Sequence, residues 1–449
     1  MRVYEKEFDI ALNGWGSSPL DKFKTGVVAH AKEREVPIRA AITMTDSSRA
    51  RCEIGFVTDI WPDRAGLFKD IFGIRQRQWE DETSFNVALI VPTGIGCEIG
   101  GHAGDAGAVA KLVGECCDRL ITHPNVVNAS DINALPGNGL YVEGSTLSRL
   151  LLGTIRLKSV RSNRVLVIIE KHQDERFIDA AINSVNGAIA TYGMKCPAVV
   201  ILDPPLDTKA IFTQTGSAAG SIEGLEGLFA VLDAHKGTYD AVALTSVIDV
   251  PDSWHEDYFK SGGEMVNPWG GVEAMLTHAV SLAYDLPVAH APMMDSRKVE
   301  EMDPGRVDSR MAAEAVSLTF INCLLEGLHR SPQVVRADTG PGMPASLGVE
   351  NVSCLVIPDG CIGLPTLAAL EQGIPVIAVQ ENRNRMQNDL GTLPWPDGQF
   401  WQVENYLEAC GLLLAMNAGL DPRSVRRPLA SVRLQEEAAR HGKREQQVT

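Results

Sequence analysis

The chain has 449 residues, of which 45% are hydrophobic and 22% charged, and this is the composition of an ordinary globular protein. The formal net charge of −16 argues against nucleic acid or an anionic membrane surface as the main partner. No apolar run approaches the roughly 20 residues that span a bilayer, and the first ten residues lack the apolar core of a secretion signal. The nine cysteines show no regular spacing of a disulfide framework. We therefore expect a cytoplasmic protein that binds neither nucleic acid nor membrane.

Residues 1–85 mix two kinds of element and predict a small α+β region. The polar stretch 76–84 marks its boundary with the rest of the chain. The predicted strands of this region are 38–45 and 50–60, and the predicted helices are 19–34 and 63–72.

From Phe85 onward, short apolar strands alternate with amphipathic helices. This alternation predicts parallel sheets with helices on both faces. Because the chain is long for one core, we expect two Rossmann-like parallel-sheet domains around a cleft, at 86–245 and 246–420, and then a polar tail at 421–449. The predicted strands are 87–91, 165–169, 198–202, 241–246, 288–290, 354–357 and 375–379. The predicted helices are 105–120, 145–152, 175–192, 223–235, 271–284, 308–328 and 364–372.

The loop after the first of these strands contains six glycines within fourteen residues. A strand, a glycine loop and a helix together present backbone N–H groups to an anion. A tight turn with glycines at positive φ is the alternative. The loop lacks the ending of a P-loop, and Ile99 interrupts the spacing of a dinucleotide fingerprint. We expect the anion to bind at Gly94, Gly96, Gly100, Gly101 and Gly104.

Residue types that transfer protons or attack a substrate gather at the ends of the predicted strands. Some lie in the glycine loop, one lies in the next polar loop, and a cysteine stands close to the start of helix 364–372, where a thiol becomes more reactive. Asx turns and buried free cysteines are the structural alternatives. The candidate catalytic residues are Cys97, Glu98, His102, His123, Asp359 and Cys361.

A second glycine-rich segment, 261–273, leads into a predicted helix. Trp269 stands directly before two glycines, which is unusual for a mere linker. Glu273 lies in the first helical turn, where compensation of the helix dipole is an alternative role. Arg297 is suited to a carboxylate or phosphate. The expected substrate-binding residues are the five loop glycines together with Asn267, Trp269, Gly270, Gly271, Glu273, Arg297 and Thr366.

The sequence requires no cofactor, although a divalent metal is compatible with it. Cys97, His102 and Asp105 fall within one loop and are the candidate ligands, but no Cys-x-x-Cys or His-x-x-x-His motif is present. A homo-oligomer is also compatible with the sequence.

The chain resembles a bacterial and plant family of unknown function over most of its length. The resemblance runs from the glycine loop through NPWGGVEAMLTHAVSL at 267–282 to IPDGCIGLPTLAALEQGIPVIAVQENRN at 357–384. It implies no activity.

Residues 354–379 are similar to the second cysteine region of the aspartate/glutamate racemase and maleate isomerase superfamily, through Gly360-Cys361 and the Gly-x-Pro-Val run at 373–376. The resemblance implies two cysteines that flank one substrate carbon, with Cys97 as the counterpart of Cys361. The chain departs from the family because Glu98 and Ile99 follow Cys97 in place of Asn-Thr, and because the chain is much longer than those enzymes.

Two further local similarities are present. Gly363, Glu371, Gly373 and Pro375 are similar to the nucleotide-binding half of two-domain glycosyltransferases and sugar 2-epimerases. Residues 93–99 are similar to a loop of the metal-dependent 4-phosphohydroxythreonine dehydrogenases, whose histidine ligands have no counterparts here.

Together these features predict a cytoplasmic enzyme that acts on a small anionic, carboxylate-bearing metabolite. Cysteine or acid–base chemistry would support isomerisation, racemisation, elimination or hydrolysis. One alternative is a nucleotide-sugar-type transferase or epimerase with a two-domain cleft. Another is a non-catalytic metabolite-binding protein.

Overall fold

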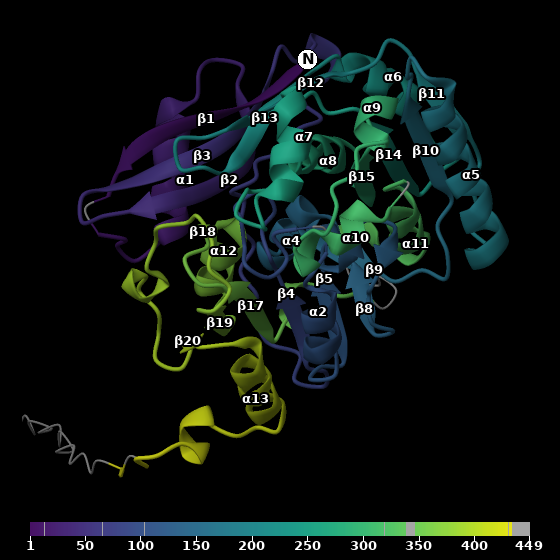
Figure 1. Cartoon of the computed structure of the whole chain (residues 1–449). Coiled ribbons are helices and arrows are strands. Elements are labelled where there is room, and N and C mark those ends of the chain that lie inside the picture. Colours follow the sequence, from purple (N-terminus) through teal and green to yellow (C-terminus); the bar gives the residue numbers. More distant parts are fainter. Residues whose placement is uncertain are drawn as a thin grey trace, which may run out of the picture.

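In the computed structural model, the described residues are 1–12, 14–64, 66–102, 104–317, 319–337, 346–429 and 431–432. Their strands form a six-stranded antiparallel sheet, a six-stranded parallel sheet, a four-stranded parallel sheet and two two-stranded pairs. Figure 1 shows the antiparallel sheet beside the two parallel sheets, with helices between them. The predicted α/β class is confirmed.

The antiparallel sheet contains three strands of the N-terminal region, two strands from the middle of the chain and the short β18 from its later part. Its order is β12-β13-β1-β3-β2-β18. Helix α1 (Pro19–His30) begins with Pro19 in its first turn, where a missing N–H costs nothing. The strands are β1 (Arg2–Ala11), β2 (Val36–Thr45), β3 (Arg49–Thr58), β12 (Asp207–Phe212), β13 (Ala218–Glu223) and β18 (Ile362–Gly363).

Two predictions for this region differ from the structure. The expected helix at 63–72 is wrong, because among the described residues of this stretch the one helical element is a 3₁₀ turn, Pro62–Arg64. Strand β1 was absent from the expected elements. It pairs with β3 on one side and with the distant β13 on the other, and its middle residues are all partly covered, so its sequence lacks a clean buried-exposed alternation.

The six-stranded parallel sheet combines two distant parts of the chain in the order β20-β19-β17-β4-β5-β8. The predicted helix 105–120 is too long, since it ends at Gly114 and residues 119–122 form β5 between β4 and β8. The strands are β4 (Asn86–Leu89), β5 (Arg119–Thr122), β8 (Gly139–Tyr141), β17 (Cys354–Pro358), β19 (Val376–Val379) and β20 (Phe400–Val403). The associated helices are α2 (Gly107–Gly114), α3 (Pro124–Val127), α4 (Gly144–Leu151), α12 (Leu364–Gln372) and α13 (Tyr406–Asn417).

The four-stranded parallel sheet has the order β11-β10-β14-β15. Helix α8 packs against β15 and also against β13 of the antiparallel sheet, so it stands between the two. The strands are β10 (Val165–Glu170), β11 (Val199–Leu202), β14 (Ala241–Ser246) and β15 (Val288–Pro292). The helices are α5 (Glu175–Tyr192), α6 (Leu225–Ala234), α7 (Asp252–Lys260), α8 (Gly270–Tyr284), α9 (Arg297–Glu300), α10 (Ala312–Ala315) and α11 (Asn322–Arg330).

The two consecutive Rossmann-like domains that the sequence predicts are not confirmed. Strand β4 from the expected first domain pairs with β17 from the expected second domain. The expected division at residue 245 also falls inside β14, which runs from Ala241 to Ser246. The predicted helix 308–328 breaks into the 3₁₀ turn Ser309–Met311, α10 and α11. Of the expected tail, 430 and 433–449 lie outside the described residues.

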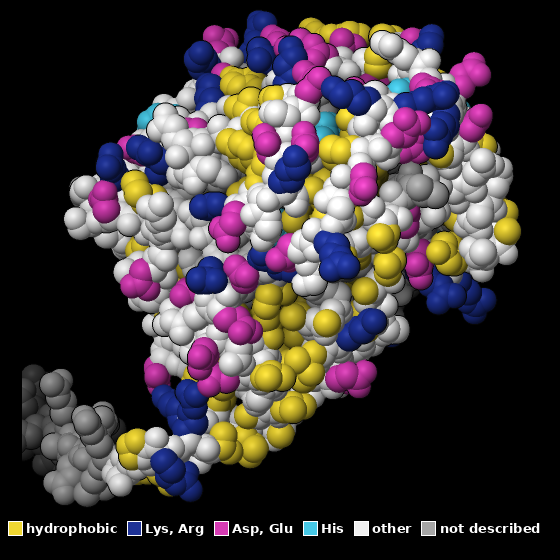
Figure 2. All heavy atoms as spheres, in the orientation of Figure 1, with side chains coloured by type: hydrophobic (Ala, Val, Ile, Leu, Met, Phe, Trp, Pro, Cys, Tyr) yellow, Lys and Arg dark blue, Asp and Glu magenta, His cyan; other side chains and the backbone are white. Residues whose placement is uncertain are grey.

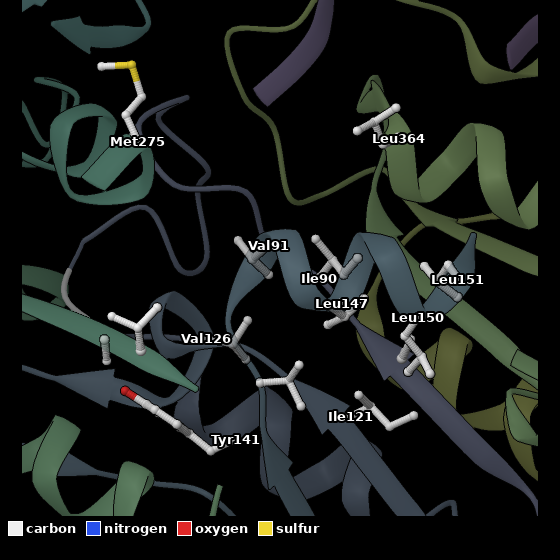
Figure 3. Packing of buried hydrophobic residues seen from close by; sticks show 14 of the residues in the cluster. Ile90, Val91, Ile121, Val126, Tyr141, Leu147, Leu150, Leu151, Met275 and Leu364 are labelled. Atoms are coloured by element: carbon white, nitrogen blue, oxygen red, sulfur yellow. The ribbon is translucent and has the colours of Figure 1, made fainter. Parts of the chain in front are cut away.

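The buried core is continuous across these layers. Figure 3 shows Leu147, Leu150 and Leu151 of α4 near Ile121 of β5, and all four belong to one cluster of buried residues. Burial of each such side chain contributes about 2 kcal/mol. Figure 2 shows apolar side chains gathered at the lower end of the molecule, where Leu407 and Leu414 of α13 are exposed. Among the helices described, none has the length and hydropathy needed to cross a membrane.

Two strand pairs lie outside the large sheets. β9 (Ile155–Lys158) pairs with β16 (Gln333–Arg336), and β6 (Asn128–Ala129) pairs with β7 (Ile132–Asn133), both antiparallel. The second pair contributes Asn128 to the cavity described below.

Candidate functional site

A cavity of about 390 Å³ lies where the sheets meet. Loops that follow four strands of the six-stranded parallel sheet line it, namely those after β4, β5, β8 and β17. Strand β15 of the other parallel sheet, strand β2 and helix α8 also line it, as do residues of α7, α9 and α10. Ligands of α/β proteins bind beyond the carboxyl ends of parallel strands, so this is the expected place for a ligand.

The Glu143 carboxylate and the His278 imidazole meet at this cavity. Glu143 follows β8 and caps α4 by accepting the backbone N–H groups of Ser145 and Thr146. Its Oε1 lies 2.7 Å from Nδ1 of His278 on α8. Burial raises the pKa of Glu143, but His278 and the Ser145 donors outweigh it and hold that pKa well below its usual range. Glu143 is therefore a charged carboxylate that stands against the His278 ring.

His123 lies beside this pair as a neutral imidazole. The backbone N–H of Val91 donates to its Nε2 over 3.1 Å, so the neutral ring carries its proton on Nδ1. Burial is the main cause that lowers the pKa of His123 to about 4; Glu143 opposes this shift and His278 adds to it. His123 is thus a fixed hydrogen-bond donor at neutral pH.

A second carboxylate–histidine pair occupies the same wall. Glu273 of α8 is one-quarter exposed, and its Oε1 lies 3.2 Å from Nδ1 of His290, whose side chain is fully covered. Nε2 of His290 lies 2.9 Å from the Ser246 hydroxyl. Glu273 is therefore the member of this pair that a ligand would meet.

The charged wall is mainly acidic. Its four carboxylates are Glu143, Glu273, Glu300 and Glu314. Its two arginines already hold carboxylates, because Arg39 pairs with Glu5 at 2.7 Å and Arg149 pairs with Asp285 at 2.7 Å.

The structure brings some of the predicted site residues to the cavity and leaves others away from its wall. His123, Cys361, Asn267, Trp269, Glu273 and Thr366 line the cavity. The remaining predicted residues lie outside that lining: Cys97, Glu98, His102, Asp359, Arg297, Gly94, Gly96, Gly100, Gly101, Gly104, Gly270 and Gly271.

The glycines of the two loops are packed against the chain itself. A Cβ atom at Gly101 would lie 2.0 Å from the Cys97 carbonyl oxygen, and one at Gly104 would lie 1.8 Å from the Asn128 carbonyl oxygen. At Gly271 it would lie 2.2 Å from the Ala218 carbonyl oxygen. Close approach of backbone to backbone therefore accounts for these glycines, and the anion that we expected from them gains no support.

Cys97 and Cys361 are both buried and lie close enough to interact electrostatically. Burial, and then the neighbouring Cys361, raise the pKa of the Cys97 thiol well above its ordinary value. Burial and Asp359 raise the pKa of Cys361. Both residues are therefore thiols at neutral pH, which are poor nucleophiles.

The three candidate metal ligands hold partners of their own, and for the Cys97 thiol the partner is the Pro92 carbonyl oxygen, 3.8 Å from Sγ. Nδ1 of His102 lies 2.8 Å from the Tyr258 hydroxyl, and Nε2 lies 3.2 Å from the Gly263 carbonyl. Asp105 accepts the Gly100 N–H over 2.6 Å. Within the described ranges, no group of three or more His, Cys, Asp or Glu side chains is arranged to hold a metal ion.

The other predicted polar residues form separate contacts. Glu98 pairs with Arg310 at 3.0 Å. Asp359 accepts a hydrogen bond from Gln402, and Arg297 pairs with Asp174, which caps α5.

Sequence reasoning did not select Glu143, His278, His290 or Ser246. One signal was present for the helix: Glu273 and Thr277 lie four positions apart and therefore share one face of α8, and both line the cavity together with the next residue, His278. The pairing of His290 with Ser246 depends on the order of β14 and β15 in the sheet, which local patterns do not give.

The fold and its cavity define an α/β protein with an internal cluster of histidines and carboxylates. Residues 86–426 match the model of a family described as protein of unknown function, DUF3326, and the chain belongs to that family. The predicted resemblance to a family of unknown function is thereby confirmed. The chain is also 34% identical over 349 residues to an uncharacterized lipoprotein of Synechococcus sp., a match that covers 76% of this chain and 93% of the relative. No solved structure matches the chain.

Proposed function

We propose that the protein is an enzyme that performs acid–base chemistry on a small organic molecule held in the cavity. The observation that carries the proposal is that α8 presents both Glu273 and the Glu143-held His278 to one enclosed space. Two proton-transfer groups on one rigid helix keep a fixed separation, which is what positioned acid–base catalysis requires.

The two groups have different roles in this proposal. His278 takes a proton at Nε2, because the Glu143 carboxylate, 2.7 Å from Nδ1, stabilises the positive charge that then forms on the ring. Glu273, as the carboxylic acid, returns its proton at a second position of the substrate and becomes a carboxylate, and His123 donates a hydrogen bond from Nδ1 to a substrate oxygen. This division suits isomerisation, racemisation or elimination, since each removes a proton and replaces or redirects it. The buried thiols of Cys97 and Cys361 have no part in it.

The residues of the cavity wall also indicate the polarity and charge of the substrate. Apolar side chains such as Met293, Met294 and Phe320 line part of it. Because both lining arginines are paired and the lining carboxylates outnumber them, we propose a substrate with an apolar part and without net negative charge, in place of the anionic metabolite that the sequence predicts.

Proton exchange provides a test that does not need the natural product. The protein would be incubated in D₂O with a panel of neutral hydroxy, keto and amino compounds, and NMR would detect deuterium at carbon. We expect the wild type to label at least one compound, and His278→Gln and Glu273→Gln to reduce the rate at least 100-fold, which is the usual contribution of such a group.

Ser148→Ala is the matched control, because Ser148 lines the same cavity but donates its hydroxyl to the Gly144 carbonyl. It should retain the exchange rate. If a compound binds but neither the wild type nor any variant exchanges its protons for deuterium, the catalytic proposal is refuted. The metabolite-binding alternative would then remain. The expected cytoplasmic location stays a proposal, since the Synechococcus relative is named a lipoprotein.

A further inference from the structure

Aromatic side chains gather at one corner of the cavity, where α7 meets the start of α8. His255 and Phe259 lie four positions apart on α7, so they share one face of that helix, and both line the cavity. Trp269 directly precedes α8 and lines the same cavity. The centres of the His255 and Trp269 rings are 5.3 Å apart. Rings from two segments of the chain thus border one enclosed space.

Tyr258 supports this corner from behind. It is fully buried and lies outside the cavity lining, and its ring meets the Trp269 ring at 90°, with 5.4 Å between the ring centres. Its hydroxyl donates to Oε1 of Glu314 over 3.2 Å. Glu314 belongs to α10 and lines the cavity. Because Trp269 and Glu314 both contact Tyr258, an indole ring and a carboxylate lie at the same corner.

The charges at this corner suit a cation. Glu314 accepts the Tyr258 hydroxyl, and after burial it is the largest cause that raises the pKa of Tyr258, as a neighbouring negative charge does. Burial lowers the pKa of His255 despite Asp295 and Asp252, so this ring is neutral at neutral pH and does not repel a cation. Among the described residues that line the cavity there is no lysine, and both arginines are held by carboxylates.

We propose that this corner is a subsite for an organic ammonium ion, which binds against the Trp269 ring with Glu314 as its counter-charge. An aromatic ring attracts a cation through its negative face, and the attraction grows where water is excluded. His255 and Phe259 contribute two further rings to the subsite. The substrate of the proposed enzyme is then a protonated amine with an apolar chain. That assignment rests on the proposed function, whereas the binding of an ammonium ion does not.

Other head groups fit this corner less well. A ligand carboxylate would meet the like charge of Glu314, and a ligand hydroxyl would leave that charge uncompensated and gain no attraction from the rings. Met293, Met294 and Phe320 supply an apolar wall for the chain of an amine. The net charge of −16 also raises the local concentration of cations around the whole protein.

Three small probes of equal chain length test the subsite, because they differ mainly in charge: n-butylammonium, n-butanol and butyrate. A ligand-observed NMR titration of the full chain at pH 7 gives a dissociation constant for each. We expect n-butylammonium to bind about 10-fold more tightly than n-butanol, and butyrate to bind more weakly than both. Equal affinities for n-butylammonium and n-butanol would overturn the subsite, and so would the absence of n-butylammonium binding.

Variants separate a cation subsite from general packing. Trp269→Leu and Glu314→Gln should each weaken the binding of n-butylammonium about 10-fold and leave that of n-butanol unchanged. Trp269→Phe keeps an aromatic ring and should lose less than Trp269→Leu. Trp254→Leu is the matched control, because Trp254 also lies on α7 but packs on Phe212, with 4.6 Å between the ring centres, outside the cavity lining. Unchanged n-butylammonium binding in both Trp269→Leu and Glu314→Gln, or an equal loss in Trp254→Leu, overturns the subsite.

The titration is independent of the deuterium exchange assay, because none of the three probes has to react. Preference for n-butylammonium without exchange on any compound would support the subsite and refute the proposed enzyme. Exchange on neutral compounds without a preference for n-butylammonium would support the enzyme and overturn the subsite.

Discussion

Oε1 of Glu143 and Nδ1 of His278 lie 2.7 Å apart and join two layers of the protein. Glu143 begins α4, which covers the six-stranded parallel sheet, whereas His278 belongs to α8, which packs on β15 of the four-stranded sheet. The same contact therefore orients a proposed base and fastens the sheets together at the cavity.

Removal of the charge from Glu143 should weaken the fold. Glu143→Gln keeps the size of the side chain but leaves His278 without its carboxylate and loses part of the cap of α4. We expect the free energy of unfolding at pH 7 to fall by about 3 kcal/mol, as measured by urea denaturation. The double variant with His278→Gln should lose less than the sum of the two single variants. Additive losses would mean that the two side chains do not interact.

A second prediction concerns the glycine packing. Gly271→Ala places a Cβ 2.2 Å from the Ala218 carbonyl oxygen and should lower the free energy of unfolding by about 3 kcal/mol. Gly411→Ala is the matched change, because Gly411 also lies in a helix, α13, but has no atom within 4 Å of the new Cβ. It should stabilise the protein by about 1 kcal/mol through helix propensity. Equal effects of the two variants in thermal or urea unfolding would refute the packing explanation for Gly271.

Local sequence patterns were sufficient to predict the bounds of many helices and strands. Helices α5 and α12 have the bounds that the sequence predicts, because Asp174 caps α5 and glycine in the left-handed conformation follows both helices, at Gly193 and Gly373. The apolar strands β10, β14 and β17 are also close to their predicted bounds, since strands buried on both faces leave a continuous apolar run.

Features that depend on contacts between distant parts of the chain could not be predicted from local sequence patterns. The contact of β4 with β17 joins residues more than 260 positions apart, and no local signal encodes it. The glycine loop shows the same limit, because Gly104 is explained by the Asn128 carbonyl that approaches it, whereas the sequence displays only an excess of glycine. The sequence placed His278 in a predicted helix, but it gave no sign that Glu143 is the partner of this histidine.

The labelling rates of the cysteines test whether Cys97 and Cys361 can act as nucleophiles. Cys97 and Cys361 are buried, and burial raises the pKa of each, so both should react slowly with a thiol reagent in the native protein. Cys117 and Cys196 are partly exposed and should be labelled first. Mass spectrometry of peptides after timed labelling at pH 7.5 gives the order. Labelling of Cys361 ahead of Cys117 and Cys196 would return the thiol to consideration as a nucleophile.

The last prediction concerns His123 and acid stability. Its pKa is about 4 in the folded protein, against 6.5 as the ordinary value that the unfolded chain retains. Between these values the unfolded chain binds a proton that the folded protein does not bind, so stability must fall as the pH is lowered through this range. From pH 7 to pH 5 the contribution of His123 amounts to a loss of about 2 kcal/mol.

His123→Gln isolates this contribution, because its amide oxygen can accept the Val91 N–H but does not titrate. Other groups, such as Glu170 with its raised pKa, change stability in the opposite direction with pH, but they are common to both proteins and cancel in the comparison. Urea unfolding at pH 7 and pH 5 should therefore show a smaller loss for the variant than for the wild type, by about 2 kcal/mol. Parallel losses in the two proteins would show that the imidazole of His123 is accessible to protons in the folded state.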